Sequence, residues 1–451
     1  MGKTLRYYYW LFKEFSKRHV KMIALSFFLS FFIVVSLVSF SSVLNKFLFS
    51  NKEIIGLVGN YNTSNIPNEI LSKISHGLVT VGPKGEVLPA LSSSWEMIDN
   101  GREFRFHLKN DLLWDDGKKL VAKDLVYNFK DITVNPVDDN TIYFKLKDRL
   151  PIFPTFLSTP LIRYPLHGVV GLYKVDKITA RQGLIKEIHL SPNKKELPLI
   201  IYKFFASESK LISAYKLGEV NKITILKENI ADNFKNWKNT KVTKKVDYSR
   251  VMSLFINMND QLLVEKDVRD AIASSIPLSK LSDFGELAKG PIPPTSWAYN
   301  EDLKQQIENV EVAKDTLKKY VDATSSAQLD FITYYDYLPT ASLIDENFKT
   351  INLSTTLSLN DFQVPGQFDL LLAFWKPPID PDQYFFWHST QTETNITGFK
   401  NVKIDKLLED GRSSIHPGER VEHYLEFQRT MAEERPSIFL YYPFIYTVER
   451  I

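Results

Sequence analysis

The stretch LSSSWEMIDNGREFRFHLKNDLLWDDGKKLVAKDLVYNF, residues Leu91–Phe129, decides the fold of this chain. Within it, Arg102–Leu108 alternates polar and apolar side chains, which predicts a half-buried strand. Asn100-Gly101 before this strand is typical of a β-hairpin, and Trp114–Gly117 predicts a further turn. We expect a short helix over Ala122–Phe129. This part of the chain is therefore predicted to consist mostly of strands and turns.

Further along the chain the periodicity of the apolar residues changes. The 401 residues after position 50 are too many for one compact core, so we expect two or three lobes. Five segments carry apolar residues at the i, i+3, i+4 spacing of helices: Ser209–Leu217, Val268–Ser275, Val312–Tyr320, Lys403–Leu408 and Glu419–Glu433. Short apolar strands are predicted at Thr141–Leu146, Leu329–Tyr334, Phe368–Phe374 and Ile438–Tyr442. Helices interleaved with buried strands indicate an α/β fold.

Residues Met22–Leu44 (MIALSFFLSFFIVVSLVSFSSVL) form an uncharged apolar run of 23 residues. At about 1.5 Å per residue, a helix of this length crosses a bilayer core of about 30 Å. The first 50 residues carry seven Lys/Arg against one Glu, and all but one of these charges precede the run. The positive-inside rule therefore places the basic and aromatic residues 1–21 in the cytoplasm and the main domain outside the cell membrane.

A cleaved secretory signal is the alternative interpretation of this N-terminus. The apolar region of such a signal is shorter, about 7–15 residues, and a small-x-small cleavage site follows it. Here the bulky sequence LNKFLFSN (Leu44–Asn51) follows instead. We therefore predict a single-pass transmembrane helix over residues 22–44 that holds the protein in the lipid bilayer.

Composition and motifs exclude several classes of function. The residues after position 50 hold 49 Lys/Arg against 52 Asp/Glu, so this part is not a basic domain that binds nucleic acid. Cysteine is absent, which excludes disulfides, a thiol nucleophile and a lipid anchor on an N-terminal Cys. The eight His residues lack metal-ligand spacing, and no nucleotide-binding or hydrolase motif occurs. Asp380 and Asp382 flank a proline, which is weak support for acid–base catalysis. We predict that the chain is not an enzyme and needs neither metal nor cofactor.

Aromatic side chains gather in one segment of the C-terminal third. Trp375 ends an apolar strand and meets the proline-rich loop Lys376–Pro381. Two interpretations of this side chain stay open, packing in the core or lining a cleft, whereas Phe385 and Phe386 are expected in the core.

Leu91–Phe129 closely resembles the signature of family 5 of the extracytoplasmic solute-binding proteins, the peptide- and nickel-binding receptors of ABC importers. The residues that fit are Trp95, Gly101, Phe106, His107, Leu108, Trp114, Asp116, Gly117, Ala122, Asp124 and Phe129. Further segments match the family in order, over roughly residues 55–450: Tyr215–Glu219, Phe255–Asn257, Asp267–Ile272, Gly290–Tyr299, Phe374-Trp375, Asp380–Asp382, Gly398-Phe399, Asp405–Leu408 and Pro436–Pro443.

The resemblance implies a type II periplasmic-binding-protein fold, with two α/β lobes that close about a hinge and a smaller accessory lobe. We expect residues 51–248 and 435–451 in lobe I, an accessory lobe at about 76–150, and residues 249–434 in lobe II. The accessory lobe is expected to be reduced, because only residues 131–140 replace a helical insertion of the family. The turn Gly168–Tyr173 also keeps only part of its family pattern.

One departure concerns the ligand. In peptide-binding members an Asp three residues after the strand-ending Trp pairs with the α-amino group of the peptide, and Pro378 stands at that position here. Asp380 is the candidate substitute. An extended peptide is expected to pair with backbone groups around Trp375, with a second wall on the other lobe. The candidate ligand-binding residues are Asn60, Tyr61, Asn62, Phe374, Trp375, Lys376 and Asp380.

The predicted function is that of a membrane-anchored receptor that captures a solute, first of all a peptide, and delivers it to an ABC permease. A degenerate receptor that acts as a sensor or surface scaffold without transport is the alternative, motivated by the anchor and the missing Asp.

Overall fold

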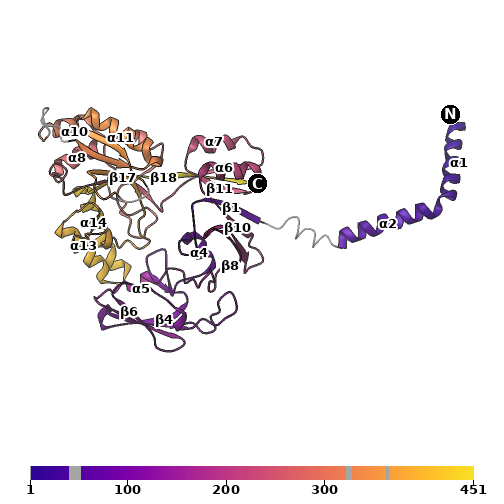
Figure 1. Ribbon diagram of the computed structural model, residues 1–451, viewed down its shortest axis with the longest axis horizontal. Coiled ribbons are helices and arrows are strands. Elements are labelled where there is room, and N and C mark those ends of the chain that lie inside the picture. Colours follow the sequence, from indigo (N-terminus) through magenta and orange to yellow (C-terminus); the bar gives the residue numbers. More distant parts are fainter. Residues whose placement is uncertain (1, 40–51, 321–327, 362–364) are drawn as a thin grey trace.

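The longest strand, β18 (Ser437–Arg450), joins two halves of one sheet. The computed structural model describes residues 2–39, 52–320, 328–361 and 365–451. The first half of β18 pairs with β13 (Val251–Ile256), and its second half pairs with β11 (Lys222–Ile225) and β12 (Thr240–Val246), always antiparallel. The sheet has twelve strands, in the order β16-β15-β17-β13-β18-β11-β1-β10-β9-β8, with β12 and β14 also paired to β18. Figure 1 shows β18 crossing from one half to the other.

The half that comes first in the sequence is built on β1 (Lys52–Val58), which pairs in parallel with β10 (Leu199–Phe205) and β11. The antiparallel strands β9 (Leu184–Pro192) and β8 (Tyr173–Arg181) extend it to one edge. Helix α4 packs on one face, while α6 and α7 pack on the other. These helices are α4 (Asn68–Ile74), α6 (Glu208–Leu217) and α7 (Glu228–Lys235).

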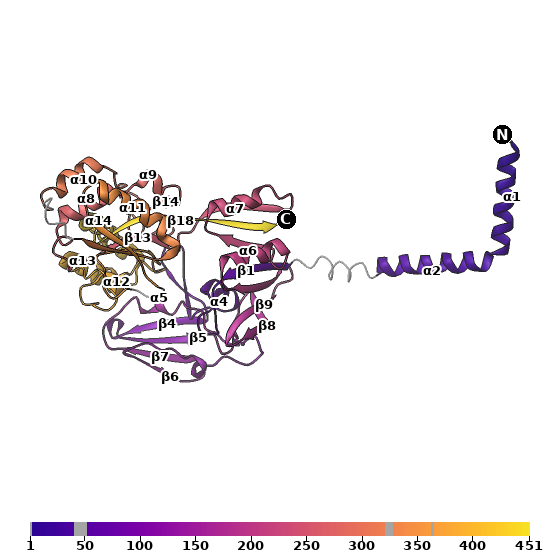
Figure 2. The same ribbon diagram turned by 45° about the horizontal axis from the view of Figure 1, so that its top comes forward.

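A separate four-stranded antiparallel sheet contains the first part of the stretch Leu91–Phe129. Its order is β4-β5-β7-β6, from β4 (Ser92–Ile98), β5 (Glu103–Leu108), β6 (Ile132–Pro136) and β7 (Thr141–Leu146). The hairpin of β2 (Val79–Val81) and β3 (Val87–Pro89) packs beside it. Figure 2 shows the short helix α5 (Phe153–Phe156) next to this sheet. The predicted strands at Arg102–Leu108 and Thr141–Leu146 are confirmed. Asn100 and Gly101 have positive φ (55° and 92°), as their turn requires.

The helix predicted over Ala122–Phe129 is wrong. Only Ala122–Asp124 forms a 3-10 turn, and the chain that follows is not helical. Leu125 and then Tyr127 and Phe129 turn inward at every second position, so the apolar spacing is that of extended chain. The rings of Tyr127 and Phe129 stack at 5.4 Å.

The other half of the large sheet is buried on both faces. Its strands are β13, β14 (Gly285–Leu287), β15 (Leu329–Thr333), β16 (Thr355–Leu359) and β17 (Leu370–Trp375). Successive side chains of a strand point to opposite faces. Leu254 of β13 and Leu372 of β17 therefore contribute to one core, with α8, α10 and α11, and Phe255 and Leu371 to the other, with α13 and α14. The helices are α8 (Lys266–Ser275), α9 (Leu278–Leu281), α10 (Val310–Leu317), α11 (Leu338–Thr350), α12 (Tyr384–Trp387), α13 (Val402–Ser413) and α14 (Pro417–Glu434).

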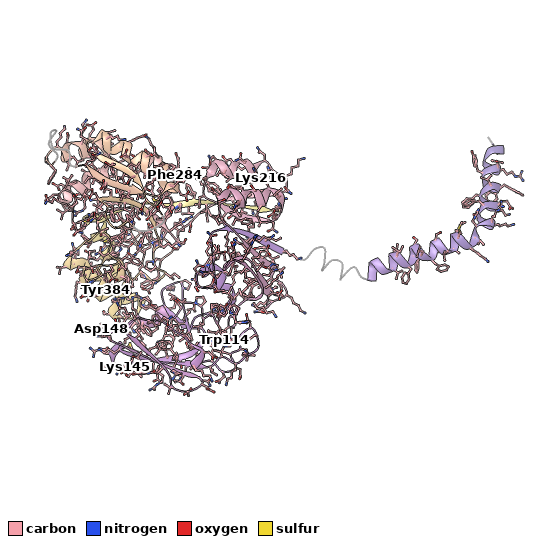
Figure 3. The ribbon with its side chains drawn as sticks, in the orientation of Figure 1. Trp114, Lys145, Asp148, Lys216, Phe284 and Tyr384 are labelled. Carbon is pink, nitrogen blue, oxygen red and sulfur yellow. The ribbon has the colours of Figure 1, made fainter. Side chains whose placement is uncertain are left out.

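Besides β18, the link between β12 and β13 joins the two halves. The Asp247 backbone N–H donates to the Pro443 carbonyl of β18 (2.9 Å), and the Arg250 Nε donates to the Asp247 carboxylate (2.8 Å). Phe284, labelled in Figure 3, accepts from the Phe444 N–H at 3.0 Å through its carbonyl. The predicted lobe boundary at 434/435 precedes β18, whereas the strand changes partners near Pro443.

The N-terminal helices α1 (Gly2–Arg18) and α2 (Val20–Ser39) lie away from the sheets (Figure 1). Over the described ranges, neither helix alone has the length and apolar character needed to cross a membrane. Residues 6–18 and 20–35 meet that condition only as a pair, bent by 80° at the break between them. Residues 40–44 of the predicted span lie outside the described residues. The transmembrane helix stays a prediction.

The position of β18 predicts a large cost for truncating its core side chains. Leu440 has no exposed surface, so Leu440→Ala should lower the free energy of unfolding by about 2–5 kcal/mol, through lost contacts and an unfilled cavity. The measurement is guanidinium denaturation. Val402→Ala is the control, because Val402 is 86% exposed and its truncation should cost less than about 0.5 kcal/mol. Equal denaturation midpoints for both variants would contradict the packing of β18.

Candidate functional site

The candidate site lies where three parallel strands end. β15 pairs in parallel with β16 and with β17, so the carboxyl ends of all three meet at one edge of the sheet. Tyr334–Tyr337 follows β15, Asn360-Asp361 follows β16, and Phe374-Trp375 completes β17. Such an edge is where open α/β sheets bind ligands.

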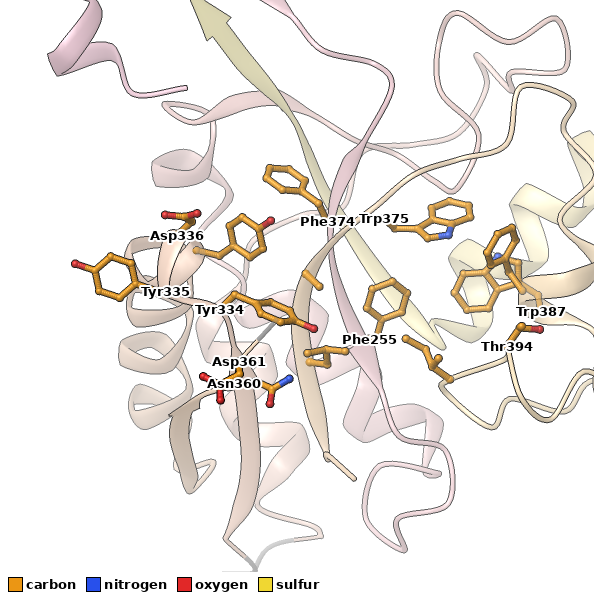
Figure 4. Close-up of a pocket in the computed structure, with 15 residues that line it drawn as sticks. Phe255, Tyr334, Tyr335, Asp336, Asn360, Asp361, Phe374, Trp375, Trp387 and Thr394 are labelled. Atoms are coloured by element: carbon orange, nitrogen blue, oxygen red, sulfur yellow. The ribbon is translucent and has the colours of Figure 1, made fainter. Parts of the chain in front are cut away.

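A cavity of about 780 Å³ occupies this edge (Figure 4). This volume lies within the range of small-ligand pockets, about 300–1,000 Å³. Most of the lining side chains are aromatic. The lining consists of Phe255, Tyr334, Tyr335, Asp336, Tyr337, Asn360, Asp361, Leu371, Ala373, Phe374, Trp375, Phe386, Trp387, Thr394 and Ile396.

Trp375 is held by rings on one side of the cavity. It makes edge contacts with Phe386 (5.6 Å between centroids) and Trp387 (6.0 Å), and its ring lies tilted on Phe439 at 5.9 Å. Trp387 in turn donates from Nε1 to the Gln383 side chain at 3.0 Å. Trp375 is 8% exposed. It therefore both packs in the core and lines the cavity, which joins the two interpretations left open by the sequence.

Phe374 points to the other face of the sheet, because neighbouring residues of a strand alternate. Tyr337 meets its ring edge-on at 5.0 Å, and the Arg250 guanidinium lies 4.8 Å from its centroid. Burial raises the pKa of the Tyr337 hydroxyl, which is therefore a neutral donor at physiological pH. The cavity thus wraps around the end of β17, with rings on both faces.

The loop after β17 is tied down by two ion pairs. The Arg420 guanidinium forms a two-pronged pair with the Asp380 carboxylate, with Nη1 at 2.9 Å from Oδ2. The Arg412 Nη2 lies 2.7 Å from the Asp382 carboxylate. Burial raises the pKa of Asp382, and Arg412 opposes that rise. These pairs fix the loop to α14 and α13.

The ion pair with Arg420 bears on the role expected of Asp380. Its side chain is 14% exposed, and the carboxylate is already neutralised by Arg420. It does not line the cavity, and neither does the exposed side chain of Lys376. Asp380 therefore positions the loop in this structure, and the idea that it substitutes for the family Asp at position 378 is not supported by its geometry.

The segment Asn60–Asn62 lies on the other half of the molecule. The Tyr61 ring packs on Phe204 at 4.9 Å, and its carbonyl accepts from the Ile185 N–H at 2.8 Å. The Asn62 N–H donates to the Asn65 side chain at 2.6 Å. These groups serve the fold around β1, and none of the three residues lines the cavity at β17. A second cavity, of about 600 Å³, begins at the next residues, Thr63 and Ser64, and extends to Trp114.

Of the predicted residues, Phe374 and Trp375 thus line one cavity, whereas Asn60–Asn62, Lys376 and Asp380 do not line it. Tyr334–Tyr337 and Asn360-Asp361 also line the cavity, and they were not predicted from the sequence. The signal that identifies Tyr334–Tyr337 is its position directly after an apolar strand, because polar residues at the ends of parallel strands converge. In the described ranges, no cluster of three His, Cys, Asp or Glu side chains is placed to hold a metal ion.

The sequence of this chain is similar to those of bacterial solute-binding proteins. Residues 86–396 match the sequence model of the bacterial extracellular solute-binding proteins, family 5 (middle region). The oligopeptide-binding protein AppA of Bacillus subtilis is 23% identical over 455 residues, which covers 85% of this chain and 83% of AppA. The probable D,D-dipeptide-binding periplasmic protein DdpA of Escherichia coli is 22% identical over 427 residues, or 80% of this chain and 81% of DdpA.

Solved structures share the fold. The crystal structure of NikZ from Campylobacter jejuni in complex with Ni(L-His) superposes with a TM-score of 0.71 at 20% identity, covering 89% of this chain and 94% of NikZ. The structure of AppA from Bacillus subtilis in complex with a nonapeptide has a TM-score of 0.70 at 20% identity, covering 88% and 94%. At this identity the likeness establishes the mixed α/β architecture and leaves the ligand open.

The ion pair at Asp380 predicts a measurable loss of stability. Arg420→Met leaves the largely buried Asp380 carboxylate without its partner and should cost about 3–5 kcal/mol in unfolding free energy. The double variant Asp380→Asn/Arg420→Met should recover part of that loss. Arg429→Met is the matched control, because its pair with Glu426 is 46% and 35% exposed and should be worth less than about 1 kcal/mol. Chemical denaturation of all three variants makes the comparison, and equal losses for Arg420→Met and Arg429→Met would contradict it.

Proposed function

Because the chain belongs to the bacterial extracellular solute-binding proteins of family 5, it is a solute receptor and not an enzyme, and we propose that it captures a peptide-like solute for an ABC importer in the cavity at the end of β17. The observation that carries this proposal is the ring-lined cavity at the joint carboxyl edge of β15, β16 and β17. Its partners are then the solute and an ABC permease in the membrane.

The cavity also offers backbone groups to an extended ligand. β17 pairs with β15 only through Leu370 and Leu371, yet the strand continues to Trp375. The edge of Ala373–Trp375 that faces β15 is therefore where a peptide would add as a short strand. The similarity to the oligopeptide-binding protein AppA and to the probable D,D-dipeptide-binding protein DdpA supports a peptide as the first ligand to test.

Capture would proceed by closure of the two halves about the segments that connect them. In this proposal the first half (51–248) moves against the second (249–434) about the Asp247–Arg250 link and the middle of β18 near Pro443. Asn60–Asn62 and the second cavity would then approach the solute only in the closed state. A ligand stabilises that state only through contacts it makes there and not in the open state.

A degenerate receptor that senses or binds at the surface without transport is the second candidate. Pro378 at the family's Asp position and the pairing of Asp380 with Arg420 favour it, because both remove the carboxylate that holds a peptide amine in relatives. Adjacent genes for a permease and an ATPase would support transport, whereas an orphan gene would favour the second candidate.

Truncation of Trp375 tests the site. The melting temperature of the wild-type protein should rise with peptide pools, and the peptide that raises it most is selected. Trp375→Ala should weaken binding of that peptide by about 30-fold, as expected for a ring at the centre of a ligand contact. Trp375→Phe should lose less, since part of the ring surface remains. Calorimetric titration measures both, and Ni(L-His) in the same panel tests the alternative ligand class. An absence of thermal shift across all pools, together with an empty cavity in the purified native protein, would count against the function.

The N-terminal anchor belongs to the same proposal. We expect the mature protein to retain Met22–Leu44, to fractionate with the cell membrane and to display its main domain on the extracytoplasmic side. Intact-mass analysis of the native protein measures this directly. An N-terminus near Asn51 would instead identify a cleaved signal and remove the anchor.

A further inference from the structure

The charged side chains that line the cavity at β17 are all acidic. Among the residues that the structure describes, Asp336 and Asp361 are the two carboxylates of the lining, and no Lys, Arg or His side chain lines it. Arg250 lies over the Phe374 ring at 4.8 Å and is already paired with Asp247 at 2.8 Å. The described side chains that line the cavity therefore carry a net negative charge.

Asp336 and Asp361 differ from the other carboxylates of this region. Asp380 and Asp382 are buried against Arg420 and Arg412. Asp336 and Asp361 are exposed, and within the part of the chain that the structure describes neither carboxylate has an ion pair or a side-chain hydrogen bond. Their charges are thus available to a ligand.

The two carboxylates and the densest ring contacts lie on different sides of the cavity. Figure 4 shows Asp336 and Asp361 on the side of Tyr334, across from Trp387 and Thr394. Aromatic faces also attract a cation, with about 0.5–1 kcal/mol at exposed sites. Both features act in the same direction, since a positive group gains from each, whereas an anion would be repelled by the carboxylates.

We infer that the solute carries a positive charge, held by Asp336 and Asp361, and an apolar body that packs on Trp375, Phe386 and Trp387. This inference rests on the proposed function, because it describes the occupant of the same cavity. The charge has two possible sources in a peptide, the α-amino group or a lysine side chain, and both present an ammonium donor to a carboxylate. Asp336 and Asp361 would then supply the negative charge that position 378 lacks.

Three probes separate the possibilities in one titration series. Phe-Leu amide carries an α-ammonium, N-acetyl-Phe-Leu amide is neutral, and N-acetyl-Phe-Lys amide carries only a side-chain ammonium. The wild-type protein should bind at least one charged probe about five-fold more tightly than the neutral probe, the size of an exposed ion pair. The charged probe that binds more tightly identifies the source of the charge, and the difference should shrink in high salt.

Variants assign the effect to the two carboxylates. Asp336→Asn/Asp361→Asn should remove the preference for the charged probe, because the charged probe then loses more affinity than the neutral probe does. Asp330→Asn is the matched control, because it removes one exposed carboxylate from the start of β15 without changing the cavity lining, and the preference should remain. Equal affinities for charged and neutral probes, or an unchanged preference in the double variant, would overturn the inference while leaving solute capture intact. If no peptide pool, probe or nickel complex binds the wild-type protein, the proposed function falls and the inference with it.

Discussion

The backbone pairing of β18 is the constraint on which the other parts of the structure depend. Its N–H and C=O groups close the sheet against β13 at one end and against β11 and β12 at the other. Its side chains enter the cores of both halves, with Leu440 in one and Val448 in another. A strand that supplies the centre of two cores cannot slip by one residue, because the slip would turn every buried side chain toward the wrong face.

The cavity is lined by aromatic rings beside a loop held by ion pairs and by carboxylates that are free to bind a ligand. The loop after β17 is held by Arg412 and Arg420, so the rings around Trp375 keep one arrangement. The carboxylates of Asp380 and Asp382 are neutralised by buried arginines of the protein itself. Exposed carboxylates on the cavity lining can instead interact with a ligand. Residues of the same type, within one region of the chain, thus serve stability in one case and recognition in the other, and their burial decides which.

Sequence patterns predicted local elements well and the assembled site only in part. The alternation at Glu103–Leu108 specified a strand, whereas the alternation at Leu125, Tyr127 and Phe129 was mistaken for a helix because the run is short. Phe374 and Trp375 were found from their rings and from a family pattern. Tyr334–Tyr337 was missed although it directly follows an apolar strand, since that position leads to the cavity only through the parallel pairing of β15 with β17, which no local pattern predicts. The partner of Asp380 lies 40 residues away, at Arg420, beyond the reach of any spacing rule.

The place of β18 in the sequence has a consequence for how the protein is made. Every strand that β18 pairs with is synthesised before it, and β1, which sits two places from it in the sheet, is synthesised almost 400 residues earlier. Contacts of such high sequence separation form slowly, because the chain loses the entropy of a long loop before these contacts stabilise it. During synthesis one edge of β13 and one edge of β11 therefore lack a partner strand until β18 is made. Such unpaired strand edges are prone to aggregation. A chain that completes its central sheet this late keeps that sheet open through most of its synthesis, which suits a protein that is threaded across a membrane before this sheet forms.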